Sequence, residues 1–197
     1  MKKLLLIVAV FLGSLSFNAN AGFLDYMGGG AAIQDVGGAF DDGVAGVFNM
    51  GKIFPKTRTK GGFAGVFGGE AEITKSLVKP KYDKGNIKAE TDILTLSGYG
   101  TYRHYFNKKF YMMLKAGVFY VKSEGEAEVT IPSYTWFGTT VGGGTTTVTT
   151  SDTDTGLTYG VQGGMALSRK MDLTANYTAY QLDTTMTLLG VGVKFKF

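Results

Sequence analysis

The sequence predicts an all-β fold in which eight antiparallel strands close into an up-and-down transmembrane β-barrel. First, apolar and polar residues alternate with a period of two in segment after segment, which is typical of strands with one apolar face. Second, 30 glycines, 14 phenylalanines and 11 tyrosines suit strands better than helices. Third, no run of about 18 apolar residues follows residue 21, so a chain that spans a membrane must satisfy its backbone in a closed barrel.

Residues 1–21 are expected to form a cleavable signal peptide. Lys2 and Lys3 precede an apolar run at residues 4–12, and the segment ends on small residues at positions 19–21. A transmembrane anchor is the alternative, but the apolar run is much shorter than the roughly 20 residues needed to cross a bilayer. The barrel domain is then residues 22–197. With no cysteine in the chain, neither a disulfide framework nor a lipid attachment site is expected.

Four strands are expected in the first half of the domain, at residues 23–35, 43–54, 61–77 and 89–106. The first two are rich in glycine, and their pattern does not assign their faces. In the third, Glu70 and Glu72 lie on the face opposite the phenylalanines. In the fourth, Leu94 and Leu96 alternate with polar residues that end at Arg103.

Four more strands are expected at residues 110–124, 155–167, 172–182 and 185–197. Lys115 lies on the polar face of the fifth strand. In the last strand, Leu189, Val191, Val193, Phe195 and Phe197 face one way and Lys194 and Lys196 the other. We expect this strand to pair with 172–182 on one edge and with 23–35 on the other, which closes the barrel.

The connections alternate in length and charge. Segments 55–60, 107–109 and 168–171 are short and basic, whereas 36–42, 78–88 and 125–154 are longer; the connection at 183–184 is short as well. Short turns on one side and long loops on the other are typical of bacterial outer-membrane barrels. We expect 78–88 to be a charged loop, and 125–154 to be the longest irregular stretch, with flanks able to extend the neighbouring strands as a hairpin.

A soluble barrel of the lipocalin type also has eight strands, but its outer face should be densely charged. Only 18% of this chain is charged, and the charges on the strands are sparse. The inverted arrangement is favoured, with Phe, Leu, Val and Met against lipid and a narrow lumen filled by side chains. A lumenal ion-pair network is therefore expected, because charges inside a membrane must be paired. Its members are Glu70, Glu72, Arg103, Lys115 and Lys194.

The signal peptide, the glycine-rich first strand, the eight alternating segments and the terminal LGVGVKFKF resemble small Gram-negative outer-membrane β-barrels of the OmpA/OmpX type. The resemblance implies an outer-membrane location among lipid and lipopolysaccharide. It also implies that Val193, Phe195 and Phe197 form the signal that the barrel-assembly machinery reads. Unlike the two-domain OmpA layout, no periplasmic cell-wall-binding domain is expected after the barrel.

A surface contact is the best functional hypothesis. Tyr134, Trp136 and Phe137 lie in segment 125–154 and could meet a host or cell-surface partner. The alternatives are that they anchor in the outer leaflet or pack on an extended hairpin.

Catalytic chemistry finds little support. The stretch GVFNMGKI at residues 46–53 matches a phosphate loop until Ile53, where serine or threonine should stand. His104 is the single histidine and is expected near a short turn, away from the outer rim. We expect no catalytic residue, metal, cofactor or nucleic-acid partner. The interpretation is a monomeric, non-enzymatic barrel with a structural or surface-interaction role. A narrow channel for small or hydrophobic solutes is the first alternative, and a lipid-modifying enzyme the second.

Overall fold

A computed structural model describes residues 24–54, 65–137 and 139–197. Within these ranges no helix is long and apolar enough to cross a membrane. The described residues form nine strands: β1 (Tyr26–Asp35), β2 (Gly43–Ile53), β3 (Gly65–Val78), β4 (Lys81–Lys84), β5 (Ile87–Tyr105), β6 (Phe110–Trp136), β7 (Thr139–Ala166), β8 (Met171–Tyr180) and β9 (Met186–Lys196).

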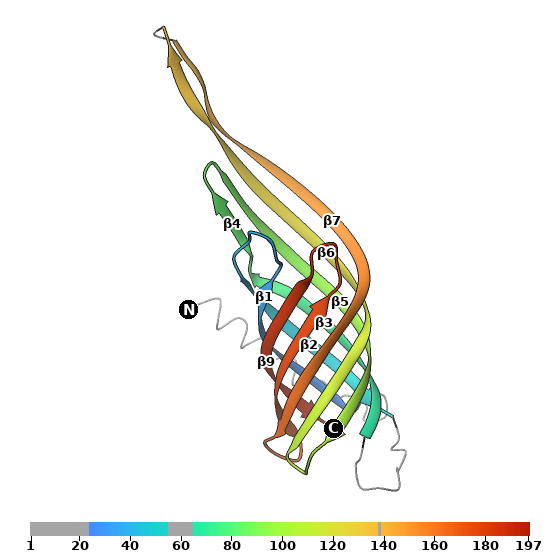
Figure 1. The fold of residues 1–197 in the computed structure, drawn as a ribbon. Helices are drawn as coiled ribbons and strands as arrows, with labels where there is room; N and C mark the ends of the chain where they lie inside the picture. The colour runs from blue at the N-terminus through green and yellow to red at the C-terminus, as the bar shows by residue number, and fades with distance from the viewer. Residues whose placement is uncertain (1–23, 55–64, 138) are drawn as a thin grey trace.

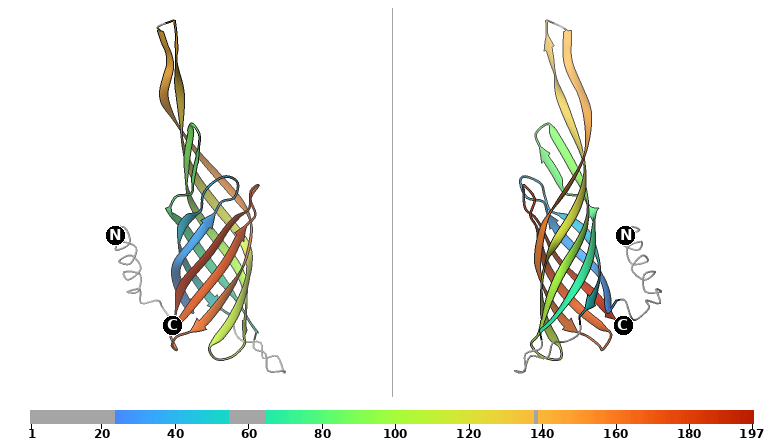
Figure 2. Two further views of the ribbon diagram at one scale, coloured as in Figure 1. Left: turned by 60° about the vertical axis from the view of Figure 1, so that its left-hand side comes forward. Right: turned by 90° about the vertical axis from the view of Figure 1, so that its right-hand side faces the viewer.

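Eight of these strands form a closed antiparallel ring in the order β3-β2-β1-β9-β8-β7-β6-β5, with β5 pairing back onto β3. The views in Figures 1 and 2 show the strands tilted around a common axis. The short strand β4 pairs with the beginning of β5 and lies outside the ring. The predicted eight-stranded up-and-down barrel is therefore confirmed, with β4 as an addition.

The closure of the barrel matches the sequence-based expectation. Strand β9 pairs with β8 along one edge and with β1 along the other, where the register runs from Tyr26 opposite Lys196 to Asp35 opposite Thr187. This pairing also decides how β1 and β2 face. Tyr26, Ala32 and Gln34 of β1 and Ala45 of β2 are buried in the lumen.

Elsewhere the alternation predicts the faces correctly. On β5, Thr95, Ser97 and Arg103 are buried, whereas Leu94 and Leu96 are exposed on the outside of the ring. The outward positions of the other strands are also apolar and exposed, which is the pattern of a barrel whose outer face meets lipid. A band of this kind would be a poor surface in water.

The two ends of the barrel differ. Two hairpins, β4/β5 and β6/β7, project from one end, whereas the C-terminus and two short turns lie at the other (Figure 1). One of these turns is closed by Asn107, whose side-chain oxygen accepts hydrogen bonds from the backbone N–H groups of Lys109 and Phe110. The expected asymmetry of short turns and long connections is present.

Two expected loops are strands instead. Segment 78–88, expected as a charged loop, contains β4 and its turn into β5. Segment 125–154, expected as irregular, belongs to β6 and β7, which stay paired from Phe110 opposite Met165 to Trp136 opposite Thr139. The reason is that the segment is rich in threonine, which favours strands, and the barrel already holds the two strands in register. The expected extension of the flanks thus continues to the tip.

Two expectations fall on other parts of the chain. The signal peptide at residues 1–21 and the basic turn at 55–60 lie outside the described residues.

Candidate functional site

The lumen near the short-turn end holds a cluster of buried charges. Glu70 and Glu72 are two residues apart on β3 and therefore point to the same side. Lys194 Nζ lies 2.5 Å from Glu70 Oε2, and Lys115 Nζ lies 2.8 Å from Glu72 Oε2 and 3.7 Å from Glu70 Oε1. Side chains from β3, β6 and β9 thus form one alternating chain of charges across the lumen.

Three tyrosines that sequence analysis did not assign to this cluster donate hydrogen bonds to its carboxylates. The Tyr26 hydroxyl lies 2.8 Å from Glu70 Oε2. The hydroxyls of Tyr99 and Tyr180 lie 3.2 and 3.3 Å from Glu72 Oε1. Tyr99 and Tyr180 stand on the polar parity of their strands, so that alternation could have placed them in the lumen. The sequence gives no comparable indication for Tyr26, because the glycine-rich pattern of β1 does not show which of its faces points into the lumen.

Arg103 is buried in the lumen and contacts aromatic rings, and it forms no ion pair with a carboxylate of the described residues. Its guanidinium carbon lies 4.5 Å from the centre of the Tyr111 ring and 5.1 Å from that of Tyr26. Its Nη1 donates a hydrogen bond of 3.3 Å to the Tyr105 hydroxyl. The structure therefore brings Glu70, Glu72, Lys115 and Lys194 together and holds Arg103 beside them by cation–π contacts.

The other half of the lumen holds an apolar cluster, and buried Gln34 and Ser76 contact it through hydrogen bonds to Met186 and Ile93. Its buried side chains come from six strands and pack on one another, with the rings of Phe119 and Tyr180 edge to face at 5.1 Å. The members of this apolar cluster are Ala32, Ala45, Val47, Ile93, Phe119, Val121, Tyr180, Met186 and Leu188. Charges and apolar side chains thus occupy separate levels of the same interior.

The outward positions change character where the hairpins leave the barrel. On β5 the apolar Leu94 and Leu96 give way to Asp92, and on β6 Tyr120 gives way to Lys122. Leu94 and Lys122 are directly opposite each other, so the change occurs at one level of the wall. Beyond it extends a sheet that we call the finger, made of residues 81–92, 121–137 and 139–154.

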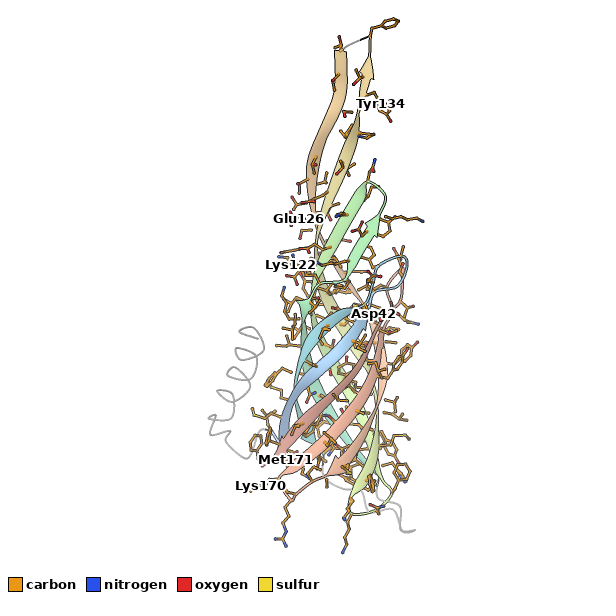
Figure 3. All side chains as sticks on the ribbon, turned by 90° about the vertical axis from the view of Figure 1, so that its left-hand side faces the viewer. Asp42, Lys122, Glu126, Tyr134, Lys170 and Met171 are labelled. Carbon is orange, nitrogen blue, oxygen red and sulfur yellow. The ribbon has the colours of Figure 1, made fainter. Side chains whose placement is uncertain are left out.

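The finger has two different faces. Its outer face carries Lys122, Glu124, Glu126 and Glu128 at alternate positions of β6. Its inner face continues the lumenal parity and is mostly apolar or threonine-rich, but it also carries Asp152 and Asp154, since Asp154 is directly opposite Val121. On this face the Tyr82 ring packs on Phe40 of the β1–β2 connection at 5.8 Å. Figure 3 shows Lys122 and Glu126 near the barrel end of the finger, and Lys170 and Met171 at the opposite end of the molecule.

The aromatic residues singled out in the sequence lie at the tip of the finger. Tyr134 is 68% exposed and lies far above the barrel wall (Figure 3), and Phe137 is 94% exposed. Trp136 is the last residue of β6, and its side chain lies outside the described part of the molecule. The tip is the end of an extended hairpin that points away from the apolar band, and a contact of these residues with a partner stays a prediction.

The structure also shows where the remaining residues singled out in the sequence lie. Residues 46–53 lie within strand β2, and His104 lies near the short-turn end with its ring edge-on to Phe106 at 5.1 Å. Among the described residues no group of three or more histidine, cysteine or acidic side chains could hold a metal ion. Val193 and Phe195 lie along the end of β9 and Phe197 follows its last residue, and their role as an assembly signal stays a prediction.

A closed antiparallel barrel with an apolar outer band, polar residues in its interior and long hairpins at one end is the architecture of β-barrel proteins of the bacterial outer membrane. Residues 4–197 match the family model described as "Outer membrane protein beta-barrel domain", and the chain belongs to this family. It is accordingly a protein of the Gram-negative outer membrane.

Comparison with solved structures gives the same fold at low sequence identity. The attachment invasion locus protein Ail of Yersinia pestis is 13% identical, with a TM-score of 0.52 over 89% of this chain and 100% of that one. Ail in complex with the heparin analogue sucrose octasulfate is 13% identical, with a TM-score of 0.55 over 88% of this chain and 97% of that one. Neisserial surface protein A is 18% identical, with a TM-score of 0.46 over 87% of this chain and 96% of that one. A comparison with curated protein sequences found no match.

Proposed function

We propose that this protein is a non-enzymatic surface-interaction protein, in which a plugged barrel anchors the finger and the tip of the finger meets a partner on another surface. The observation that carries the proposal is the composition of the tip. Residues 129–151 contain no charged side chain, yet Ile131 and Val148 are about half exposed and Tyr134 and Phe137 still more so. Exposed apolar residues gathered on a projecting element are typical of interaction sites, and tyrosine is frequent among residues that dominate binding.

The lumen supports the anchoring role. Eight strands leave an interior just wide enough for side chains to fill. Here the charged level and the apolar level lie one above the other, with Lys115 and Phe119 from the same strand in successive levels. Water could cross the lumen only if the ion pairs of the charged level and the packing of the apolar level were both broken. We therefore propose a barrel that does not conduct.

The charge of the finger indicates that its partner is not a polyanion. The heparin analogue seen with Ail is strongly anionic. The finger has four lysines against four glutamates and four aspartates, so that it repels polyanions with a net charge of −4. We propose a protein partner whose contact surface is apolar with basic surroundings.

The proposal can be tested with bacteria that display the chain. Val129 and Thr146 are directly opposite each other, so residues 130–145 can be replaced by an Asn-Gly turn that keeps the register. Adhesion to cultured epithelial cells should be conferred by the wild-type chain and lost in the shortened variant. Tyr134→Ser with Phe137→Ser should also reduce adhesion, whereas Thr147→Ser with Thr149→Ser, lower on the same hairpin, should not.

Three results would contradict the proposal. Adhesion that survives the shortening would show that the finger is not the contact. Retention on immobilised heparin that depends on the finger would contradict the charge argument. Reproducible conductance steps of the purified barrel in planar bilayers would make it a channel, which is the main alternative function.

A further inference from the structure

A cavity of about 420 Å³ opens at the finger end of the barrel, inside the ring formed by the β1–β2 connection, the base of the finger and the β8–β9 turn. It is separate from the tip of the finger and plays no part in the function proposed above. Its position is decided by β7, which pairs with β8 only as far as Thr158 opposite Tyr180. Beyond that point β7 leans away with the finger, and the space between it and the β8–β9 turn is the cavity.

The floor of the cavity is apolar. Ile93, Val121 and Met186 line it from below, and Val36 and Leu182 line it from the sides. These side chains belong to, or pack against, the apolar cluster that fills the upper lumen. The cavity is therefore a cup that is closed toward the periplasmic side and open to the outside. A floor of this kind favours an apolar group over water.

The rim of the cavity is anionic. Asp152, Asp154 and Asp183 line it, and none of the described lysines and arginines does. Within the described part of the chain none of these three carboxylates forms an ion pair, although acids elsewhere on the finger, such as Glu90 and Glu124, do. Their negative charges therefore add up at the mouth of an apolar cup.

Two of these carboxylates are held in place by the backbone. One oxygen of Asp152 accepts a hydrogen bond from the N–H of Thr153 at 2.8 Å, and one oxygen of Asp154 accepts from Thr155 at 2.7 Å. Asp154 is directly opposite Val121 of the floor, and Asp152 stands one pleat further out on the same face. The second oxygen of each carboxylate has no hydrogen bond or ion pair within the described residues.

We propose that this cavity is a binding site for a small amphipathic cation, with an aromatic or short aliphatic body on the floor and an ammonium or amidinium group among Asp152, Asp154 and Asp183. A cation of this shape satisfies both parts of the site at once. A neutral molecule of the same shape leaves the three carboxylates without a counter-charge, and an anion is repelled by them. A bare metal ion gains nothing from the floor.

The test uses the full barrel in nanodiscs of zwitterionic lipid, so that the membrane itself does not attract the cation. Phenethylammonium is the probe, and 2-phenylethanol is its neutral counterpart. Binding is followed by NMR of the methyl groups of Ile93, Val121 and Met186. Saturable shifts at these methyls are expected with phenethylammonium, and about tenfold weaker binding with the alcohol.

The variant Asp152→Asn with Asp154→Asn keeps the oxygen acceptors for Thr153 and Thr155 and removes two charges. It should weaken phenethylammonium binding about tenfold. The matched control is Glu126→Gln with Glu128→Gln, which removes the same charge from the outer face of the same sheet and should leave binding unchanged. Heat-modifiable gel migration checks that both variants are folded.

The proposal is overturned by any of three results. Equal binding of the alcohol would make the site merely apolar. Equal weakening in the control variant would reduce the effect to general attraction by an acidic finger. Shifts that do not saturate, or that arise at outward-facing methyls such as Leu96, would mean that the probe partitions into lipid. None of these outcomes depends on adhesion by the tip, so the two proposals fail independently.

Discussion

The ammonium of Lys194 on β9 lies 2.5 Å from the Glu70 carboxylate on β3, although β1 and β2 stand between these two strands in the ring. Both side chains are almost completely buried. The pair therefore ties opposite parts of the wall together through the lumen. Removing one partner leaves a buried charge, which is more costly than the loss of an exposed pair.

Lys194→Met should lower the free energy of unfolding by about 3 kcal/mol, because Glu70 is left buried with Lys115 at 3.7 Å as its remaining cation. The measurement is urea unfolding in detergent or lipid, followed by the gel shift of the folded barrel. Lys75→Met is the matched control, since Lys75 pairs with Asp92 at 2.7 Å on the exposed outer face and should contribute less than about 1 kcal/mol. Equal effects of the two substitutions would contradict a lumenal role for Lys194.

Tyr26→Phe should also destabilise the barrel, by about 1.5–3 kcal/mol, because the tyrosine donates a hydrogen bond to a buried carboxylate. Tyr102→Phe removes the same atom from an outward-facing ring whose hydroxyl makes no hydrogen bond in the described part of the chain. That variant should unfold at the urea concentration of the wild type. A stable Tyr26→Phe barrel would show that Glu70 is satisfied by its two lysines alone.

Gly117→Ala tests how closely β5 and β6 approach. A Cβ atom at Gly117 would overlap the backbone carbonyl of Gly98, which cannot move without opening the ladder. We expect a loss of about 1–3 kcal/mol in the free energy of unfolding. At Gly98 the same methyl group meets nothing within 4 Å and points outward, so Gly98→Ala should be neutral. If both variants behave alike, the register of the two strands is wrong.

The base of the finger carries a pH-sensitive contact. Lys79 donates a hydrogen bond of 2.5 Å to Glu90, and this bond lowers the pKa of the Glu90 carboxyl below its usual value. A lowered carboxyl pKa stabilises the contact above the pKa of the free acid, and the stabilisation is lost as the pH falls through the lowered value. NMR titration of Glu90 should give a higher pKa in Lys79→Met and no change in Lys122→Met. An unchanged pKa in Lys79→Met would rule out the hydrogen bond in solution.

Much of the barrel could be predicted from alternation because one face of each strand meets lipid and the other meets the lumen. The same spacing places Glu70 and Glu72 on one face, and strong alternation in β6 and β9 places Lys115 and Lys194 toward them. Arg103 lies in the lumen as predicted but does not join the ion pairs. Alternation predicts on which side of the barrel wall a side chain lies, and it does not predict which side chains lie at the same height along the barrel axis. At the height of Arg103 the neighbouring side chains are Tyr26 and Tyr111.

For a related reason, sequence analysis predicted strand extension only in the flanks of segment 125–154 and not along the whole finger. Both of its faces contact water, so no contrast in hydropathy marks residues 125–154 as strands, and threonine and glycine are also common in loops. Pairing with a partner already held by the barrel decides their conformation.

The sequence by itself determined the class of the fold, the faces of the strands with strong alternation, the side of the lumenal charges and the exported, membrane-embedded nature of the chain. These properties depend on local periodicity and on the solvent that each face meets. The facing of β1, the tyrosines around Glu70 and Glu72, the length of the finger and the cup at its base depend on which strands become neighbours and in what register. Only closure of the ring decides which strands are neighbours and in what register, because closure brings together residues as distant in the sequence as Tyr26 and Lys196.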